Sequence, residues 1–240
     1  MKALDILECF KDDQQEVGIS EISVKVNLPV SSVHRIVQSL EFEGFLLQNL
    51  ETRRYRLGTK LLSLSYKCQS YQKYMDVASA RAEELGQITG ETVNVAICSC
   101  DSTIHIYRTE SPHVLRPTFP LNRPFPAYCT AVGRIFLSEM SDTAQRWAYN
   151  NSRDEIGMNE ESFLTLLHDV RANGYALDDE SFSAGLRCVA APVRLSSGNV
   201  VYALSISAPV VRMGDAVYQK AQQLVVEYAA KISADIQSME

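Results

Sequence analysis

A row of hydrogen-bonding side chains lies near the start of the chain, in the segment 18–45. At about 100° per residue, these side chains fall on the face of a short helix opposite an apolar stripe. The apolar stripe consists of Val33, Ile36, Val37 and Leu40. The polar members are Ser31, Ser32, His34, Arg35 and Gln38. Because arginine can pair with guanine and glutamine with adenine in the major groove, the pattern predicts a helix that reads DNA bases.

Three arginines within four residues follow this helix. Arg53, Arg54 and Arg56 lie in a predicted two-stranded ribbon, residues 45–47 and 53–57, which Gly58 ends. Arginines placed in this way contact phosphates or the minor groove, and such contacts position a protein on DNA without reading its sequence. A helix pair followed by a basic ribbon predicts a winged helix-turn-helix.

Cap and turn residues predict where the two helices begin and end. The pair Leu28-Pro29 interrupts the helical pattern, because the residue before a proline avoids the helical conformation. Ser20 is expected to cap the first helix, and Gly44 is expected to end the second in the left-handed conformation.

The charge of the whole chain, −6, gives no sign of nucleic-acid binding. Its distribution is more informative, since residues 25–60 carry six basic and three acidic side chains. This local excess of +3 predicts weak DNA binding by one copy. Specific binding is therefore expected to need two or more copies bound together.

A group of small polar side chains comes from a predicted hairpin near the C-terminus. Residues 186–195 and 200–209 read as strands, and Ser197-Gly198 is expected to form a two-residue turn. This turn would place Cys188 opposite Ser207 and Ala190 opposite Ser205, all on one face. Such a face can form the floor of a site for a small polar ligand, although small residues also serve close packing alone.

Beyond residue 60, helical and strand patterns alternate. Helices are expected in the segments 61–90, 133–140, 160–173 and 216–240, and a hairpin is expected at 92–99 and 103–109. The last helix is expected to turn inward Val217, Ala221, Leu224, Val225, Tyr228 and Ile232. The pattern predicts an α+β fold, with helices on one face of a sheet and a possible cavity on the other.

The six cysteines show no zinc-binding spacing and no CxxC pair, so no metal site and no cofactor are predicted. A redox-responsive regulator that uses Cys98, Cys100 or Cys188 is one alternative, because Cys98 and Cys100 would share one face of a strand. A second alternative is an enzyme with Cys188 as nucleophile and a histidine as base. The candidate bases are His105, His113 and His168, none of which stands in a recognisable motif with Cys188.

No apolar run approaches the roughly 20 residues that a membrane span needs, and no signal peptide is recognised. With thiols expected to be reduced, the sequence predicts a cytoplasmic protein.

Over essentially its full length, the chain resembles the IclR-type family of bacterial transcription regulators. The matching stretches are Lys2-Ala3-Leu4-Asp5-Ile6-Leu7, Leu28-Pro29 through Val33-His34-Arg35, Tyr55-Arg56-Leu57-Gly58, Gly90-Glu91-Thr92-Val93, Thr130-Ala131-Val132-Gly133, Gly174-Tyr175-Ala176 with Asp178-Asp179-Glu180, the run 185–193, and Leu204-Ser205-Ile206-Ser207-Ala208-Pro209.

The resemblance implies three parts: a winged helix-turn-helix at 1–58, a linker helix used in dimerisation at 59–72, and an effector-binding domain at 73–240. The last part would be GAF-like, with a curved antiparallel sheet. The resemblance also implies a homodimer, often assembled as a dimer of dimers, on double-stranded operator DNA.

In that family small organic acids commonly occupy a pocket of the effector-binding domain. Carried over by motif, the effector-binding residues would be Ala131, Val132, Asp178, Leu186, Cys188, Ser205 and Ser207. Leu115 and Phe125 would complete an apolar wall. Paired hydroxyls and amides at the start of a helix favour a carboxylate, so a small 2-oxo acid or a sugar-derived acid is expected.

Some residues depart from the family's pattern, and these affect the expected DNA contacts and the shape of the pocket. They are Val30, where many relatives carry a basic residue, Tyr128 and Cys129 before the TA.G segment, and Ser181 after the DDE run.

Overall fold

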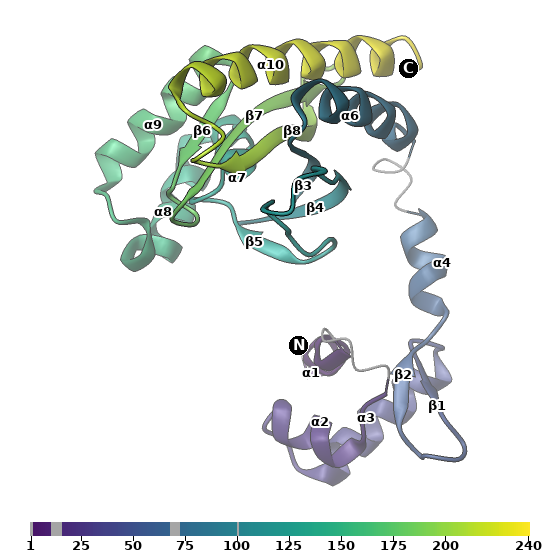
Figure 1. The fold of residues 1–240 in the computed structure, drawn as a ribbon. Coiled ribbons are helices and arrows are strands. Elements are labelled where there is room, and N and C mark those ends of the chain that lie inside the picture. Colours follow the sequence, from purple (N-terminus) through teal and green to yellow (C-terminus); the bar gives the residue numbers. More distant parts are fainter. Residues whose placement is uncertain (1, 11–15, 68–72, 100) are drawn as a thin grey trace. The chain divides into compact units, whose positions relative to one another are not determined.

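The computed structural model describes residues 2–10, 16–67, 73–99 and 101–240. The chain divides into two compact units, Met1–Gln72 and Lys73–Glu240, which we describe separately (Figure 1). Cys100 and the second part of the expected linker helix, 68–72, lie outside the described residues. None of the described helices combines the length and the apolar composition that crossing a bilayer requires.

The first unit is a helical cluster with a two-stranded ribbon. Its elements are α1 (Lys2–Leu7), η1 (Glu8–Phe10), α2 (Ile19–Lys25), α3 (Val30–Phe42), β1 (Leu46–Gln48), β2 (Tyr55–Leu57) and α4 (Lys60–Lys67). Ile22 of α2 and the pair Val33 and Val37 of α3 are fully buried in one core with Leu46 of β1. The predicted apolar stripe of α3 therefore faces the core, although Ile36 and Leu40 are only partly buried.

The predicted cap of α2 is wrong. Gly18, not Ser20, is the N-cap residue, and no side chain caps this helix. Ser20 lies one residue inside the helix, because the helix begins where the chain leaves the bridge between Val17 and Tyr55. The predicted end of α3 is confirmed, since Gly44 has a φ of 79° and its amide donates to the Glu41 carbonyl.

The second unit contains one six-stranded antiparallel sheet, with strand order β5-β4-β3-β8-β7-β6. The strands are β3 (Thr92–Ser99), β4 (Ser102–Thr109), β5 (Pro124–Pro126), β6 (Ala176–Asp179), β7 (Leu186–Arg194) and β8 (Val200–Pro209). The helices are α6 (Met75–Thr89), α7 (Ala131–Glu139), α8 (Asp142–Ile156), α9 (Glu160–Asn173) and α10 (Asp215–Gln237). With the helical first unit, this architecture confirms the α+β class.

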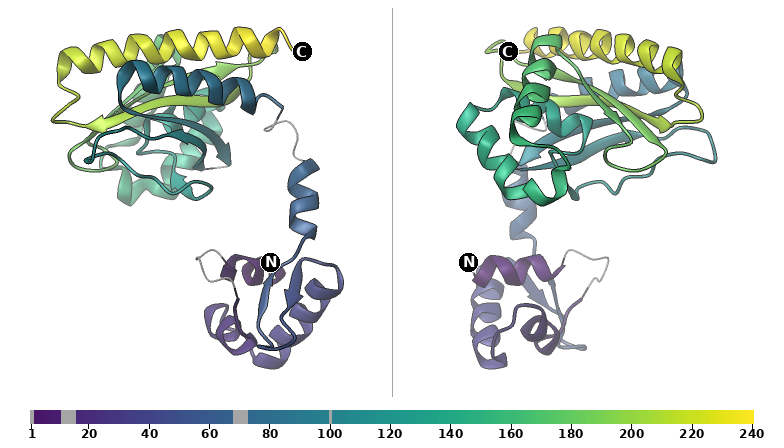
Figure 2. Two further views of the ribbon diagram at one scale, coloured as in Figure 1. Left: turned by 45° about the vertical axis from the view of Figure 1, so that its right-hand side comes forward. Right: turned by 90° about the vertical axis from the view of Figure 1, so that its left-hand side faces the viewer.

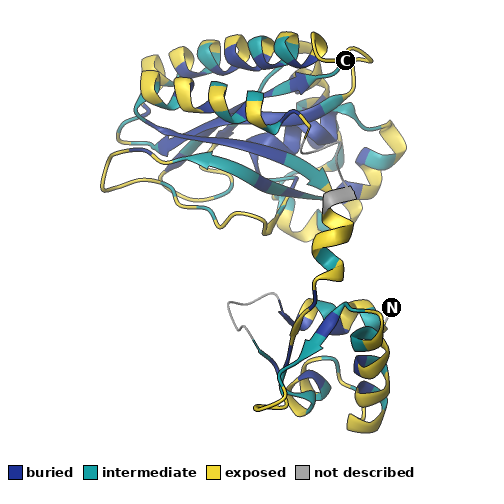
Figure 3. Ribbon diagram, turned by 90° about the vertical axis from the view of Figure 1, so that its right-hand side faces the viewer, coloured by how far each residue is buried: buried dark blue, intermediate teal, exposed yellow. Residues whose placement is uncertain are grey.

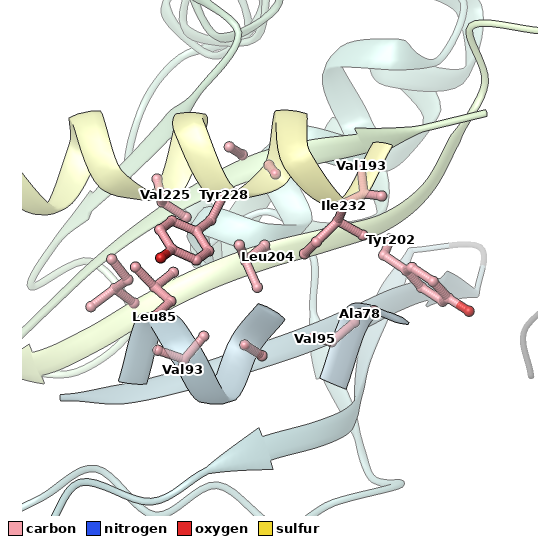
Figure 4. Close-up of a cluster of buried hydrophobic side chains, with 14 of the residues drawn as sticks. Ala78, Leu85, Val93, Val95, Val193, Tyr202, Leu204, Val225, Tyr228 and Ile232 are labelled. Atoms are coloured by element: carbon pink, nitrogen blue, oxygen red, sulfur yellow. The ribbon is translucent and has the colours of Figure 1, made fainter. Parts of the chain in front are cut away.

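Helices cover both faces of this sheet. On one face α6 and α10 lie side by side over a core that includes Leu85, Val95, Leu204 and Ile232 (Figures 2 and 4). On the other face α7 packs on β7 and β8, and α9 packs on α7 (Figure 1). The expectation of helices on a single face is therefore wrong. The strands between the two layers are mostly buried, whereas the outer sides of α6 and α10 are exposed (Figure 3).

Two details of the helices differ from the prediction. Helix α8 was not expected, because it buries only Gln145, Ala148 and Tyr149 and shows no apolar stripe. Its ends carry ordinary signals, since the Ser141 side chain accepts from the Ala144 amide and Gly157 is left-handed. In α10, Val217 is 49% exposed and does not belong to the inner side.

The hairpin of β7 and β8 has the predicted register but not the predicted turn. Cys188 lies opposite Ser207 and Ala190 opposite Ser205. The register shifts next to Arg194, which pairs with Val200, and the Leu195 amide then donates to the Asn199 carbonyl. A three-residue turn and an extra residue in β8 therefore compensate each other, and the pairing beyond them is the one that a two-residue turn would give.

Candidate functional site

In the first unit the turn between α2 and α3 presents one face of α3 to solvent. Asn27 adopts a left-handed φ of 51°, and the Ser23 hydroxyl donates to the Leu28 carbonyl at 2.5 Å. Pro29 then starts α3. Opposite the buried Val33 and Val37, the exposed residues of α3 include Ser31, His34, Arg35 and Gln38, while Ser32 is half-buried. The side chains predicted to read bases thus share one accessible helical surface.

The ribbon holds its three arginines in two different ways. Arg53, at the tip with a φ of 59°, and Arg56 on β2 are exposed. Arg54 turns back toward the body of the unit, where Nη2 lies 2.9 Å from Glu21 Oε2 and 3.1 Å from the Glu16 carbonyl. Glu16 in turn accepts hydrogen bonds from Asn49 and Thr52 of the ribbon. Arg54 therefore anchors the ribbon within the unit, while Arg53 and Arg56 remain exposed, and the phosphate contacts of all three stay a prediction.

In the second unit, side chains from three neighbouring strands form a polar floor under α7. Asp178 of β6 pairs with Cys188 of β7, and Cys188 pairs with Ser207 of β8. Residues directly opposite each other in an antiparallel pair share one face of the sheet. Ser205 of β8 continues this floor toward Asn94 of β3.

These floor residues line a small cavity together with the start of α7. The full lining is His105, Phe119, Phe125, Thr130, Ala131, Val132, Asp178, Phe182, Cys188, Ser205 and Ser207. The cavity volume is about 20 Å³, which is room for about one water molecule. Six of the seven residues predicted to bind an effector therefore surround a single cavity, and their binding role stays a prediction.

Of the three residues predicted to form an apolar wall, Leu186 and Leu115 lie outside the cavity lining and Phe125 lies within it. Leu186 is buried at the base of β7 against the core beneath α7, outside the cavity lining. Leu115 is 63% exposed, and its carbonyl accepts a hydrogen bond from Arg212. Phe125 does line the cavity, where it packs edge-on to Phe119 and Phe182.

The start of α7 offers backbone donors to the cavity. The Thr130 hydroxyl accepts from the Gly133 amide at 3.1 Å, and the Arg134 amide donates to the Thr130 carbonyl. The amides of Ala131 and Val132 come before the first intrahelical donor, so they remain for a ligand, and the helix dipole favours an anion there. The start of α7 packs directly against the backbone of Ala127. Only glycine fits at position 133, because a Cβ there would lie 2.0 Å from the Ala127 carbonyl oxygen.

Asp178 fixes the loop that covers the cavity. Its Oδ1 accepts from the Ser181 amide at 2.8 Å and from the Phe182 amide at 3.2 Å, and it is 1% exposed. Burial raises the pKa of Asp178, while the buried guanidinium of Arg134 opposes that rise. Arg134 also donates to the carbonyls of Tyr128 and Leu177, which holds α7 to β6.

Four residues of the cavity lining were not predicted from the sequence: His105, Phe119, Thr130 and Phe182. Asn94, which lies beside two serines of the lining, was not predicted either. The Asn94 amide nitrogen lies 3.4 Å from both Ser205 Oγ and Ser207 Oγ. His105 stacks on Phe119 with a centroid distance of 5.4 Å. These residues come from strands and loops far apart in the chain, and no sequence motif links them.

Three of the departures from the family pattern gather in a neighbouring hollow of about 450 Å³. Tyr128, Cys129 and Ser181 line it together with Arg134 and Glu155, and the Tyr128 hydroxyl donates to Glu155 at 2.6 Å. Phe182 lines both the hollow and the cavity. These departures therefore change the surroundings of the cavity but do not line it.

The cysteines do not favour the redox alternative. Burial raises the pKa of the Cys188 thiol to about 12, so this group is no thiolate at neutral pH. Among the described cysteines, namely Cys9, Cys98, Cys129 and Cys188, none forms a disulfide. No group of three or more His, Cys, Asp or Glu side chains in the described part of the chain could hold a metal ion.

The cavity does not form a thiol–imidazole pair either. His105 and Cys188 line the same cavity, but β4 and β7 are separated by β3 and β8. Three strand spacings put the two backbones roughly 14 Å apart. The buried Nδ1 of His105 has no hydrogen-bond partner, so it is not paired with the Cys188 thiol.

Comparison with known proteins identifies the family. A model described as the IclR helix-turn-helix domain matches residues 1–50, and one described as the bacterial transcriptional regulator IclR C-terminal region matches residues 69–234. The HTH-type transcriptional regulator KdgR of Escherichia coli K12 is 30% identical over 241 residues, which covers 98% of this chain and 91% of KdgR.

Solved structures share the fold. A putative IclR transcriptional regulator from Silicibacter superposes with a TM-score of 0.83 at 20% identity, covering 98% of this chain and 95% of that one. An IclR homologue from Microbacterium hydrocarbonoxydans, complexed with 4-hydroxybenzoate, superposes with a TM-score of 0.81 at 21% identity, covering 99% and 98%. With both parts of the chain matched and a relative aligned over nearly its whole length, this protein belongs to the IclR family of bacterial transcriptional regulators.

Proposed function

We propose that this regulator binds operator DNA through α3 and the ribbon, and that a small carboxylic acid in the α7 cavity controls that binding. The observation that carries the proposal is the convergence of two sets of donors on one cavity. The hydroxyls of Ser205 and Ser207 come from the sheet, and the amides of Ala131 and Val132 come from the start of α7.

Each set suits a carboxylate for a separate reason. The Asn94 amide donates to both serine oxygens, so their O–H groups can donate to a ligand. The amides of Ala131 and Val132 lie at the positive end of the helix dipole, which attracts an anion such as a carboxylate. No lysine or arginine lines the cavity within the described residues, so backbone and hydroxyl donors would have to neutralise the acid.

The small volume of the cavity suggests how binding would act on the DNA-binding unit. An acid of several carbons does not fit into about 20 Å³, so Phe182 and its loop would have to move outward. A ligand shifts a conformational equilibrium only when it binds the two states with different affinity. The narrow cavity and a wider, ligand-filled form would be such a pair of states, and residues 59–72 would connect them to the first unit.

Two copies would bind together on DNA. On α4 the apolar side chain of Leu62 is 70% exposed, and a second copy of the linker helix would cover it. A twofold dimer would then read half-sites about 34 Å apart, or a multiple of that distance. The proposal covers a homodimer and a dimer of dimers alike.

Calorimetry on the full-length protein tests the acid. A panel of 2-oxo, hydroxy and sugar-derived acids is titrated into the wild type, the S205A/S207A double variant and the S162A variant, whose exposed serine on α9 serves as the control. We expect one or more acids to bind the wild type and S162A equally, and to bind S205A/S207A at least about tenfold more weakly, the factor that a loss of about 1.4 kcal/mol gives. Absence of binding by every acid, or equal binding to all three proteins, would refute the proposal.

The link to DNA is tested separately. A duplex selected from a random library by the full-length protein is titrated by fluorescence anisotropy, with and without the acid that binds. We expect the acid to change the Kd for DNA in the wild type, and the same change to be lost in S205A/S207A.

A further inference from the structure

A β-bulge directs His105 into the cavity. Asn94 pairs with Arg108 and Val95 with Tyr107, but the register then shifts and Ala96 pairs with His105. Without the shift, Ile106 would lie opposite Ala96, and His105 would belong to the other face of the sheet. Bulges re-aim side chains in this way, often beside functional sites. Ala96 belongs to the core under α7, and His105 accordingly lines the cavity.

The imidazole is enclosed by aromatic rings and lacks a hydrogen bond. His105 is 6% exposed, stacks on Phe119 and meets the edge of Phe125 at a centroid distance of 5.5 Å. Its Nδ1 is buried without a hydrogen-bond partner. Leaving a polar atom buried and unpaired costs free energy, so such an atom in a cavity wall indicates a partner that the cavity supplies.

We propose that His105 is a specificity-determining contact that selects carboxylic acids bearing a hydroxyl group remote from the carboxylate. This inference rests on the proposed function, since it takes the carboxylate to lie at Ser205, Ser207 and the start of α7. Strands β8 and β4 are separated only by β3, so their backbones lie about 10 Å apart. A ligand that reaches from one end to the other therefore presents a group several bonds away from its carboxylate.

The chemistry of the imidazole decides which group it accepts. Burial, together with the nearby Arg108, lowers the pKa of His105 to about 4, so the ring is neutral at pH 7. A neutral imidazole can donate or accept one hydrogen bond at each nitrogen, which suits a hydroxyl. It offers no positive charge to a second carboxylate, whose desolvation among Phe119, Phe125 and Phe182 would be costly.

Two matched series of acids test this selection on the full-length protein. They are butyrate, 4-hydroxybutyrate and succinate, and benzoate, 4-hydroxybenzoate and terephthalate. Within each series only the remote group changes, from hydrogen to hydroxyl to carboxylate. In the wild type, calorimetry should show the hydroxy acid binding at least about tenfold more tightly than either companion in one series or both.

Three variants separate recognition from structure. H105F keeps an aromatic ring in the stack but removes both nitrogens, and should bring the hydroxyl preference below about twofold while the unsubstituted acid keeps its affinity. H105Q retains a polar group and should restore part of the preference. Y107F, which alters the other face of the same strand, should leave the preference unchanged.

The outcomes divide clearly. A hydroxyl preference that persists in H105F overturns the assignment of His105. A wild type that binds acids of the wider panel but shows no preference within either series also overturns it, while leaving the proposed function intact. Failure of every acid to bind removes the proposed function and this inference together.

If H105F and H105Q do not fold, a measurement on protein that keeps His105 tests the inference instead. The chain has four histidines, so the ¹⁵N signals of His105 can be assigned by substituting the other three. Saturation with the hydroxy acid should shift the ¹⁵N resonances of His105 by more than saturation with the unsubstituted acid does. Equal shifts for the two acids would overturn the inference.

Discussion

Arg54 on the ribbon and Glu21 on α2 form an ion pair in which Nη2 and Oε2 are 2.9 Å apart. The same guanidinium donates to the carbonyl of Glu16, so one side chain ties the ribbon to the segment that leads into α2. Arg54, which the sequence predicts to contact DNA, is thus already hydrogen-bonded within its own unit.

The first prediction follows from this contact. Arg54→Ala should destabilise the DNA-binding unit by about 1 kcal/mol, because it removes a charged hydrogen bond and a half-exposed ion pair. Glu21→Gln should cost less, since Arg54 keeps its bonds to the Glu16 carbonyl. Urea unfolding followed by circular dichroism measures both. Unchanged stability of the Arg54→Ala protein would contradict the anchoring role of Arg54.

The second prediction separates base contacts from backbone contacts. Arg35→Ala should cost about 1–3 kcal/mol and relax the preference at one base position, whereas Arg56→Ala should weaken all sequences alike and lower the salt slope by about 1. Both residues are exposed. Binding of a set of single-base operator variants at several salt concentrations measures the two effects. Arg171→Ala, an exposed site on α9, is the control for loss of one positive charge. A uniform loss for both variants would contradict the orientation assigned to α3.

The third prediction concerns acid stability. The folded-state pKa of His105 is about 4, below the usual value of 6.5, so the unfolded chain binds the proton more readily. The free energy of unfolding therefore keeps its full value above pH 6.5. As the pH falls from 6.5 toward 4 it decreases, because the unfolded chain takes up a proton that the folded protein does not. Between pH 7 and pH 4 the wild type should lose about 3 kcal/mol more than H105F.

Urea unfolding at pH 7, 5.5 and 4 measures this difference. The only tryptophan of the chain, Trp147 on α8, reports on the second unit. Parallel pH profiles for the wild type and H105F would show that the ring is not held neutral.

The fourth prediction concerns the close approach at the start of α7. Gly133→Ala should destabilise the second unit by about 1–3 kcal/mol or prevent its folding, because the new Cβ would lie 2.0 Å from the Ala127 carbonyl oxygen. Gly214→Ala is the matched control, since no atom lies within 4 Å of a Cβ at that position and its φ of −61° suits alanine. Its effect should stay within about 0.5 kcal/mol. Similar losses in both proteins would mean that the approach at Gly133 is not the cause.

Local patterns predicted the elements whose apolar spacing or caps are strong. The stripe of α3, the stop at Gly44 and the strands β7 and β8 are of this kind, because neighbouring residues alone decide them. Helix α8 was missed, since its few buried residues leave no apolar stripe to recognise. The register of Cys188 against Ser207 was right because a longer turn and a bulge cancel each other.

The sequence by itself determined an amphipathic helix with a polar outer face, a basic ribbon, a small polar face on one hairpin and the family to which the chain belongs. Only the tertiary structure decided that Arg54 anchors the ribbon, that Leu186 stays outside the cavity and that α7 covers the second face of the sheet. It also placed Asn94 beside Ser205 and His105 in the lining of the same cavity. This arrangement depends on β3 lying between β4 and β8 and on one bulge, and long-range strand pairing leaves no periodic signal in the sequence.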